Sequence, residues 1–82
     1  MNLELAILHV LTASPRALRP RVIRGFLPSF LGRDVSLADI QRGLTRLENK
    51  GHANGTDTGE EDEHGVRVVV YKETADGRLR VL

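Results

Sequence analysis

The chain has 82 residues, of which 40% are hydrophobic and 28% are charged, and its formal net charge is +1. This length suits a single small domain over residues 1–82, and the apolar content is high enough to oppose chain entropy, which excludes wholesale disorder. Cysteine is absent, which excludes disulfide bonds, thiolate metal sites and cysteine nucleophiles.

The first predicted element is a helix over residues 3–13. Apolar residues recur at helical spacing, with Ile7 and Leu11 among them. Asn2 is placed to cap the first turn, and the Ser14–Pro15 pair ends the run.

A second helix is predicted to begin near Pro20, because proline suits the first turn of a helix. Its apolar residues are Val22, Ile23, Phe26 and Leu27. Pro28 disfavours helical geometry at the residue before it, so the helix ends or kinks there. Phe30 and Leu31 are then expected to pack back before Gly32 turns the chain.

The clearest element is a helix over residues 37–50. Ser36 and Asp39 form a capping pair, and Gly51 follows the last helical residue as a left-handed cap. One face of the helix is apolar and carries Leu37, Ile40, Leu44 and Leu47. The opposite face is a continuous polar stripe of Gln41, Arg42, Thr45, Arg46 and Asn49.

After Gly51 the pattern predicts a β-hairpin. Residues 66–72 are rich in β-branched side chains, as is typical of a strand. Residues 54–65 contain three glycines and the acidic run Glu60–Glu63. We expect this stretch to form a long mobile tip, because its like charges repel one another.

The tail from Thr74 to Leu82 has two interpretations. Thr74 can cap a short helix that carries Leu79 and Leu82. Alternatively, Asp76–Gly77 can form a tight turn into a strand. The residues alone favour neither.

Charge is distributed unevenly along the chain. Residues 16–50 contain eight basic residues and three acidic ones, a net charge of +5. Residues 54–76 contain seven acidic residues and two basic ones, a net charge of −5. A basic segment attracts a polyanion through counterion release, so a nucleic acid should approach the middle of the chain.

Two segments resemble the winged helix-turn-helix class of small transcriptional regulators, the MarR-like and PadR-like proteins. The first is the stretch Val35-Ser36-Leu37-x-x-Ile40-x-x-x-Leu44-x-x-Leu47-Glu48-x-Lys50-Gly51, which is similar to the recognition helix of that class. The second is Tyr71-x-x-Thr74-x-x-Gly77-Arg78, which resembles the segment that leaves the wing and favours a terminal helix.

The resemblance implies an α+β, mainly α fold with three helices, a hairpin wing and a short C-terminal helix. It implies a regulator that binds double-stranded DNA with the helix at 37–50 in the major groove. We expect a homodimer, because twofold pairing lets two such helices engage successive major grooves. Polar side chains of this helix would read bases, and arginines near the second helix would hold phosphates. The expected DNA-binding residues are Gln41, Arg42, Thr45, Arg46, Asn49, Arg19, Arg21 and Arg24.

The wing departs from this class, because Glu60–Glu63 stand where basic residues usually contact DNA. This departure supports an alternative, a winged-helix protein-interaction module whose acidic wing binds a basic partner.

No enzyme activity, cofactor or metal site is expected. The hydroxyls have no convincing His and carboxylate partners, and none of the three histidines stands at helical ligand spacing from another. No signal peptide or membrane span can be identified in the sequence, so we expect a cytoplasmic protein.

Overall fold

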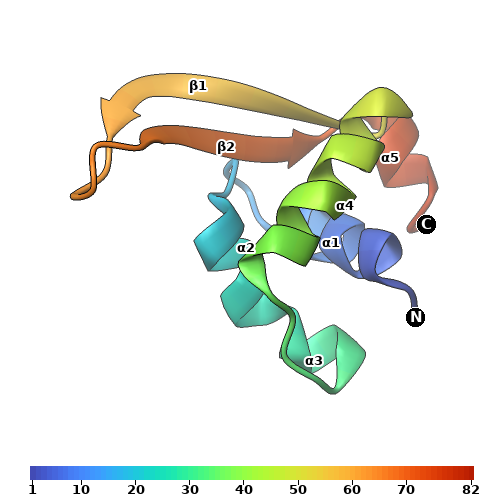
Figure 1. Cartoon of the computed structure of the whole chain (residues 1–82). Helices are drawn as coiled ribbons and strands as arrows, with labels where there is room; N and C mark the ends of the chain where they lie inside the picture. The colour runs from blue at the N-terminus through green and yellow to red at the C-terminus, as the bar shows by residue number, and fades with distance from the viewer.

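The computed structural model describes all 82 residues, and it contains five helices and one two-stranded antiparallel hairpin. The hairpin extends along one side of the helices, and both chain termini lie at the end of the molecule away from its tip (Figure 1). The elements are α1 (Leu3–Ala13), α2 (Pro20–Phe26), α3 (Pro28–Leu31), α4 (Leu37–Asn49), β1 (Ala53–Glu61), β2 (Arg67–Glu73) and α5 (Ala75–Leu79). The predicted mainly α fold with a hairpin is confirmed. No helix combines the length and the apolar character needed to cross a membrane.

The core forms where α1, α2 and α4 meet. Ile7, Leu11, Ile23 and Leu44 are fully buried within it. The Asn2 side chain accepts a hydrogen bond from the Leu5 backbone N–H at 2.8 Å, which confirms the predicted cap of α1.

α1 and α4 approach each other closely at Gly43. A Cβ at this position would lie 3.0 Å from Cδ1 of Ile7. The missing side chain therefore lets the two helices pack at short range.

The predicted interruption of the second helix lies between α2 and α3. Leu27 keeps helical backbone angles, but Pro28 begins the separate short helix α3. The left-handed Gly32, with φ of 70°, then ends α3. Phe30 does not join the core as expected, because its side chain is 37% exposed.

The hairpin corrects the prediction of a long mobile tip. Residues 53–61 form strand β1, which pairs with β2 in antiparallel register from Ala53 opposite Glu73 to Asp57 opposite Val69. A register irregularity follows before Glu61 pairs with Arg67. Strand β2, rich in β-branched residues, supplies a pairing edge that overrides the poor strand propensity of the glycines and acids in β1.

The tail forms a helix, as the resemblance predicted. The Thr74 hydroxyl caps α5 by accepting from the Gly77 N–H at 3.1 Å, and it donates to the Gly51 carbonyl at 2.6 Å. The Thr74 N–H donates to the His52 carbonyl at 3.0 Å. These bonds hold the start of α5 against the turn that follows α4.

Gly77 cannot be replaced without moving the backbone. A Cβ at Gly77 would lie 1.9 Å from the carbonyl oxygen of His52. We expect Gly77→Ala to lower the free energy of unfolding by about 2 kcal/mol or more, measured by urea denaturation.

The matched control is Gly25→Ala. Gly25 also lies in a helix, but a Cβ there would meet nothing within 4 Å. Because alanine is a better helix former, this variant should be unchanged or more stable by up to about 1 kcal/mol. Equal stability of the two variants would contradict the proposed clash.

Candidate nucleic-acid interface

The caps of α4 fix where its polar face begins. The Ser36 hydroxyl accepts a hydrogen bond from the Asp39 N–H at 3.1 Å, so the predicted N-cap is present. The Asp39 carboxylate does not complete a reciprocal capping box, because it pairs with Arg42 instead. At the other end, Gly51 with φ of 76° follows the helix as predicted.

All five polar residues predicted on α4 are exposed, but they do not point in one direction. Gln41 and Thr45 line a cleft between α4 and the hairpin. Arg42, Arg46 and Asn49 do not line this cleft. By helical spacing, Arg42, Thr45 and Asn49 lie along the most outward line of the helix, opposite the buried Ile40 and Leu47.

Two of these side chains already have partners. The guanidinium of Arg42 forms an ion pair with Asp39 on an exposed surface, where such pairs contribute little stability. The Thr45 hydroxyl donates to the Gln41 carbonyl at 3.0 Å. A ligand on this face can therefore recruit Arg42 at small cost, whereas the Thr45 hydroxyl remains available as an acceptor.

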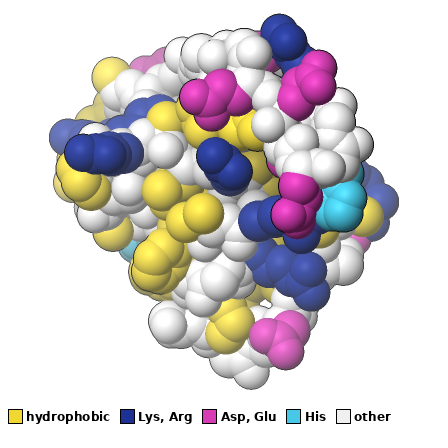
Figure 2. Space-filling model, turned by 90° about the vertical axis from the view of Figure 1, so that its left-hand side faces the viewer, with side chains coloured by type: hydrophobic (Ala, Val, Ile, Leu, Met, Phe, Trp, Pro, Cys, Tyr) yellow, Lys and Arg dark blue, Asp and Glu magenta, His cyan; other side chains and the backbone are white.

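The arginines predicted around α2 are exposed, and they separate into two groups. Arg19 and Arg21 line the cleft, and Arg24 does not. Figure 2 shows the face of the molecule that carries α2 and the hairpin tip, where Lys and Arg side chains lie close to Asp and Glu side chains. The basic middle of the chain and its acidic segment therefore meet on one surface.

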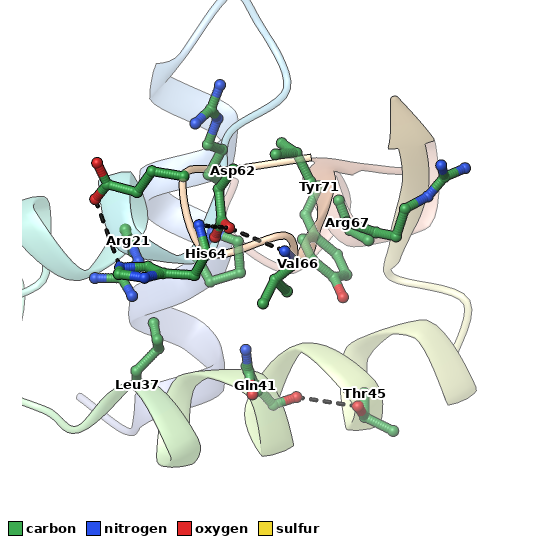
Figure 3. A pocket seen from close by; sticks show the side chains of 14 residues that line it. Arg21, Leu37, Gln41, Thr45, Asp62, His64, Val66, Arg67 and Tyr71 are labelled. Atoms are coloured by element: carbon green, nitrogen blue, oxygen red, sulfur yellow. Dashed lines mark hydrogen bonds and ion pairs between the residues drawn. The ribbon is translucent and has the colours of Figure 1, made fainter. Parts of the chain in front are cut away.

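The cleft between α4 and the hairpin has a volume of about 770 Å³. In Figure 3, Leu37, Gln41 and Thr45 form one wall along α4, and hairpin residues including Tyr71 face them. Burial raises the pKa of the Tyr71 phenol, and the nearby Glu48 carboxylate raises it further, so the phenol stays neutral at physiological pH. The walls supply both hydrogen-bond donors and fixed charges to anything that enters.

The acidic tip, Glu60–Glu63, is structured by Asp62. Its Oδ1 accepts hydrogen bonds from the backbone N–H groups of His64, at 2.8 Å, and Val66, at 3.0 Å. The bonds from Val66 and His64 lower the pKa of Asp62 below its usual value. The negative charge at the mouth of the cleft is therefore held in place by a tight turn.

A second carboxylate on the hairpin, that of Asp57, is also held by hydrogen bonds. Asp57 accepts from the Gly59 N–H at 2.8 Å and from Nε of Arg67 at 3.2 Å, and these bonds lower its pKa. Arg67 lines the cleft, so its guanidinium is partly neutralised there. The hairpin thus offers the cleft more negative than positive charge.

The base of the hairpin is fixed to α1 by a side chain that sequence reasoning missed. The Lys72 ammonium donates to the carbonyls of Leu11 and Ser14, both at 2.8 Å, and also bonds to Glu73. These carbonyls lie at the C-terminal end of α1, where a positive charge is favourable. A lysine directly after the apolar run Val68–Tyr71 was the signal in the sequence that could have drawn attention to this side chain.

Glu73 completes this anchor. Its side chain is only 2% exposed and pairs with Lys72 and with Arg78, the latter at 3.2 Å. Burial raises the pKa of Glu73, but the hydrogen bonds from Lys72 and Arg78 outweigh it and hold the pKa below its usual value.

Leu18 adds a further attachment of the hairpin. Its backbone N–H donates to the Tyr71 carbonyl at 2.9 Å, and the Tyr71 N–H donates to the Leu18 carbonyl at 2.8 Å. The segment before α2 thereby lies along the free edge of β2. The arginines that follow Leu18 are brought to the cleft by this bridge.

Comparisons with solved structures find similar folds in transcriptional regulators. PadR of Bacillus subtilis in complex with operator DNA matches 96% of this chain and 44% of that chain, with a TM-score of 0.77 and 21% identity. A candidate transcriptional regulator of Thermoplasma acidophilum matches 95% of this chain and 71% of that chain, with a TM-score of 0.75 and 19% identity. FabT of Streptococcus pneumoniae in complex with DNA matches 95% of this chain and 47% of that chain, with a TM-score of 0.61 and 25% identity.

The chain has a winged helix-turn-helix fold. β1 and β2 form the wing, and α4 is the helix that directly precedes it. The chain spans less than half the length of the two regulators solved with DNA. No protein-family model matches the sequence, and no curated protein matches it significantly.

The wing anchor makes stability depend on pH. A carboxylate whose pKa is lowered by folding stabilises the fold above its unfolded pKa, here about 4.5, and this contribution is lost as the pH falls through the lower folded value. We expect Glu73→Gln to reduce the free energy of unfolding by about 1–3 kcal/mol at pH 7, because the neutral amide loses the charge-assisted bonds with Lys72 and Arg78. The difference from the unmodified protein should shrink at pH 3.

Glu63→Gln is the control, because the Glu63 side chain is 86% exposed. Its effect at pH 7 should stay within about 0.5 kcal/mol. Chemical denaturation at both pH values measures these differences. A Glu73→Gln penalty of the same size at pH 3 and pH 7 would show that its charge does not stabilise the anchor.

Proposed function

We propose that the chain is a sequence-specific DNA-binding protein that regulates transcription and reads the major groove with α4. The observation that carries this proposal is the exposed polar face of α4, which has no covering element and lies beside the wing. The solved complexes of PadR with operator DNA and of FabT with DNA support it, because both match this chain in fold.

The outward residues of α4 match the chemistry of base edges. Arg42 and Arg46 are suited to bidentate contacts with guanine, and Gln41 and Asn49 to contacts with adenine. Thr45 presents its methyl group, since its hydroxyl bonds to the Gln41 carbonyl, and a methyl group suits the thymine methyl. These five side chains are the proposed sequence-reading set.

Arg19, Arg21 and Arg24 are the proposed phosphate contacts. All three are exposed, and Arg19 and Arg21 face the cleft beside α4. A DNA strand in this cleft would meet these guanidinium groups on one side and the acidic tip on the other. We therefore assign the phosphate contacts to the arginines at α2. The wing is excluded from this role because it bears Glu60–Glu63.

A homodimer fits this mode of binding. Twofold pairing would place two α4 helices in successive major grooves about 34 Å apart. Two copies would also double the number of phosphate contacts and sharpen the salt dependence.

A second candidate function is a protein-interaction module that uses the acidic tip. The observation in its favour is the cluster of carboxylates, fixed by the Asp62 turn and exposed at the end of the wing. Such a module would bind a basic protein surface and would show no duplex binding above background.

The first test is fluorescence anisotropy with labelled random duplex DNA at about 50 and 200 mM salt. Four to six phosphate contacts per protomer predict a log–log salt slope of roughly −4 to −5, and so a loss of affinity by orders of magnitude between these conditions. Absence of binding at 50 mM salt would reject DNA binding and leave the protein-interaction module as the better candidate.

The second test asks whether α4 reads the DNA sequence. On a duplex selected for tight binding, Arg42→Ala with Arg46→Ala should weaken affinity by tenfold or more, because each bidentate guanine contact contributes about 1–3 kcal/mol of discrimination. Arg80→Ala is the control, since Arg80 is an exposed arginine at the end of α5, outside the cleft. If the double variant binds as tightly as the Arg80→Ala control, α4 does not read the DNA.

A further inference from the structure

An apolar stripe runs along the outside of α2 and α3. It consists of Val22, Phe26 and Phe30, which are 42%, 53% and 37% exposed. The three residues are spaced four apart, and the backbone stays helical through Leu27, so they follow one edge of the kinked helix. The core instead takes Ile23 and Leu27 from these helices.

The stripe is not explained by DNA binding. None of its three residues lines the cleft between α4 and the wing. Phe30 also stacks on the ring of His9 in α1, with ring centroids 5.7 Å apart and an interplanar angle of 17°. This stacking fixes the Phe30 ring beside α1, so this end of the stripe has a defined shape. Exposed aromatic side chains that gather in this way mark interaction sites.

The chain segment that carries the stripe has basic side chains but no acidic ones. Residues 5–33, which include α2, α3 and all of α1 after Glu4, contain no Asp or Glu. The same segment contains five arginines, all exposed: Arg16, Arg19, Arg21, Arg24 and Arg33. In Figure 2 hydrophobic side chains gather over part of this face with Lys and Arg side chains beside them, and Asp and Glu side chains also lie on it. The helices that carry the stripe therefore offer apolar and basic side chains to a partner, and the neighbouring Asp62 carboxylate, which acts on Arg21, belongs to the hairpin.

This charge pattern selects the occupant. Two copies of the stripe packed face to face would bring arginines together, which is unfavourable. A segment with carboxylates around an apolar edge would satisfy both the aromatic side chains and the guanidinium groups. Because Arg pairs well with carboxylates, such a segment gains charge-assisted hydrogen bonds at the rim of the stripe.

We propose that the apolar stripe is a docking site for an acidic amphipathic helix of a partner protein. Apolar residues of that helix, three or four apart, would lie on Val22, Phe26 and Phe30, as in other helix-in-groove complexes. Its carboxylates would pair with Arg16 and Arg33. Because the stripe lies outside the cleft, the partner and DNA occupy different surfaces, and the chain can connect the two.

The experiment uses random sixteen-residue peptides displayed on phage and selected on the immobilised full chain. The selected sequences should be enriched in Asp and Glu, with apolar residues three or four positions apart. No enrichment above an empty support, or enrichment of neutral or basic sequences, would overturn the proposal.

Variants then locate the site, with one synthetic selected peptide as the labelled probe. Val22→Ser with Phe26→Ser should weaken peptide binding tenfold or more, because aromatic residues dominate such interfaces. Arg16→Glu with Arg33→Glu should also weaken it at least tenfold, and this second variant leaves the apolar side chains in place. The control is Leu79→Ser with Leu82→Ser, since these residues are 66% and 88% exposed at the end of the chain and lie outside the stripe.

Each variant is first compared with the unmodified chain by its thermal unfolding midpoint. If the variant Val22→Ser with Phe26→Ser and the variant Arg16→Glu with Arg33→Glu both bind the peptide as tightly as the unmodified chain, the proposal is overturned. Sedimentation equilibrium tests the other occupant, a second copy. If the unmodified chain forms a dimer that Val22→Ser with Phe26→Ser dissociates, the stripe is a self-association surface and the partner helix is rejected.

Discussion

The packing of α4 on α1 is the constraint on which the rest of the structure depends. Gly43 allows Ile7 to approach the α4 backbone, and the apolar edge of α4 is buried there. Once that edge is fixed, helical geometry leaves the polar residues only the outward side. The wing can then stand beside α4, because Gly55 fits under the Tyr71 ring and its N–H donates to Glu48 at 3.1 Å. The packing of α4 on α1 and the contacts of Gly55 with Tyr71 and Glu48 together leave the cleft between α4 and the wing.

Local signals made the helices predictable from the sequence. The caps at Asn2, Ser36 and Gly51 act within one turn, so α1 and α4 were placed almost to the residue. The prediction of a helix at the end of the chain depended on the resemblance, since Thr74 alone allowed two interpretations. Strand β1 was missed because its own residues disfavour a strand, and only its partner β2 makes the pairing favourable.

The site was predictable in its residue types but not in its arrangement. Spacing on α4 gives an exposed polar face, yet it cannot show that Arg42 is paired with Asp39 or that Gln41 turns toward the wing. Those facts depend on the position of the hairpin. That position is set by Lys72 and by the Leu18 bridge, and both connect segments more than fifty residues apart. The sequence around Lys72 can mark an unusual lysine, but no pattern within a short window identifies the distant carbonyls that it bonds to.

The bonds from Lys72 to α1 also bear on how the chain folds. They join residues 58 and 61 positions apart in an 82-residue chain, so closing this loop removes much of the freedom of the unfolded chain for only two hydrogen bonds. The helices, in contrast, form through contacts between near neighbours. Because contacts between distant residues slow folding, we expect docking of the hairpin on α1 to follow formation of the helices.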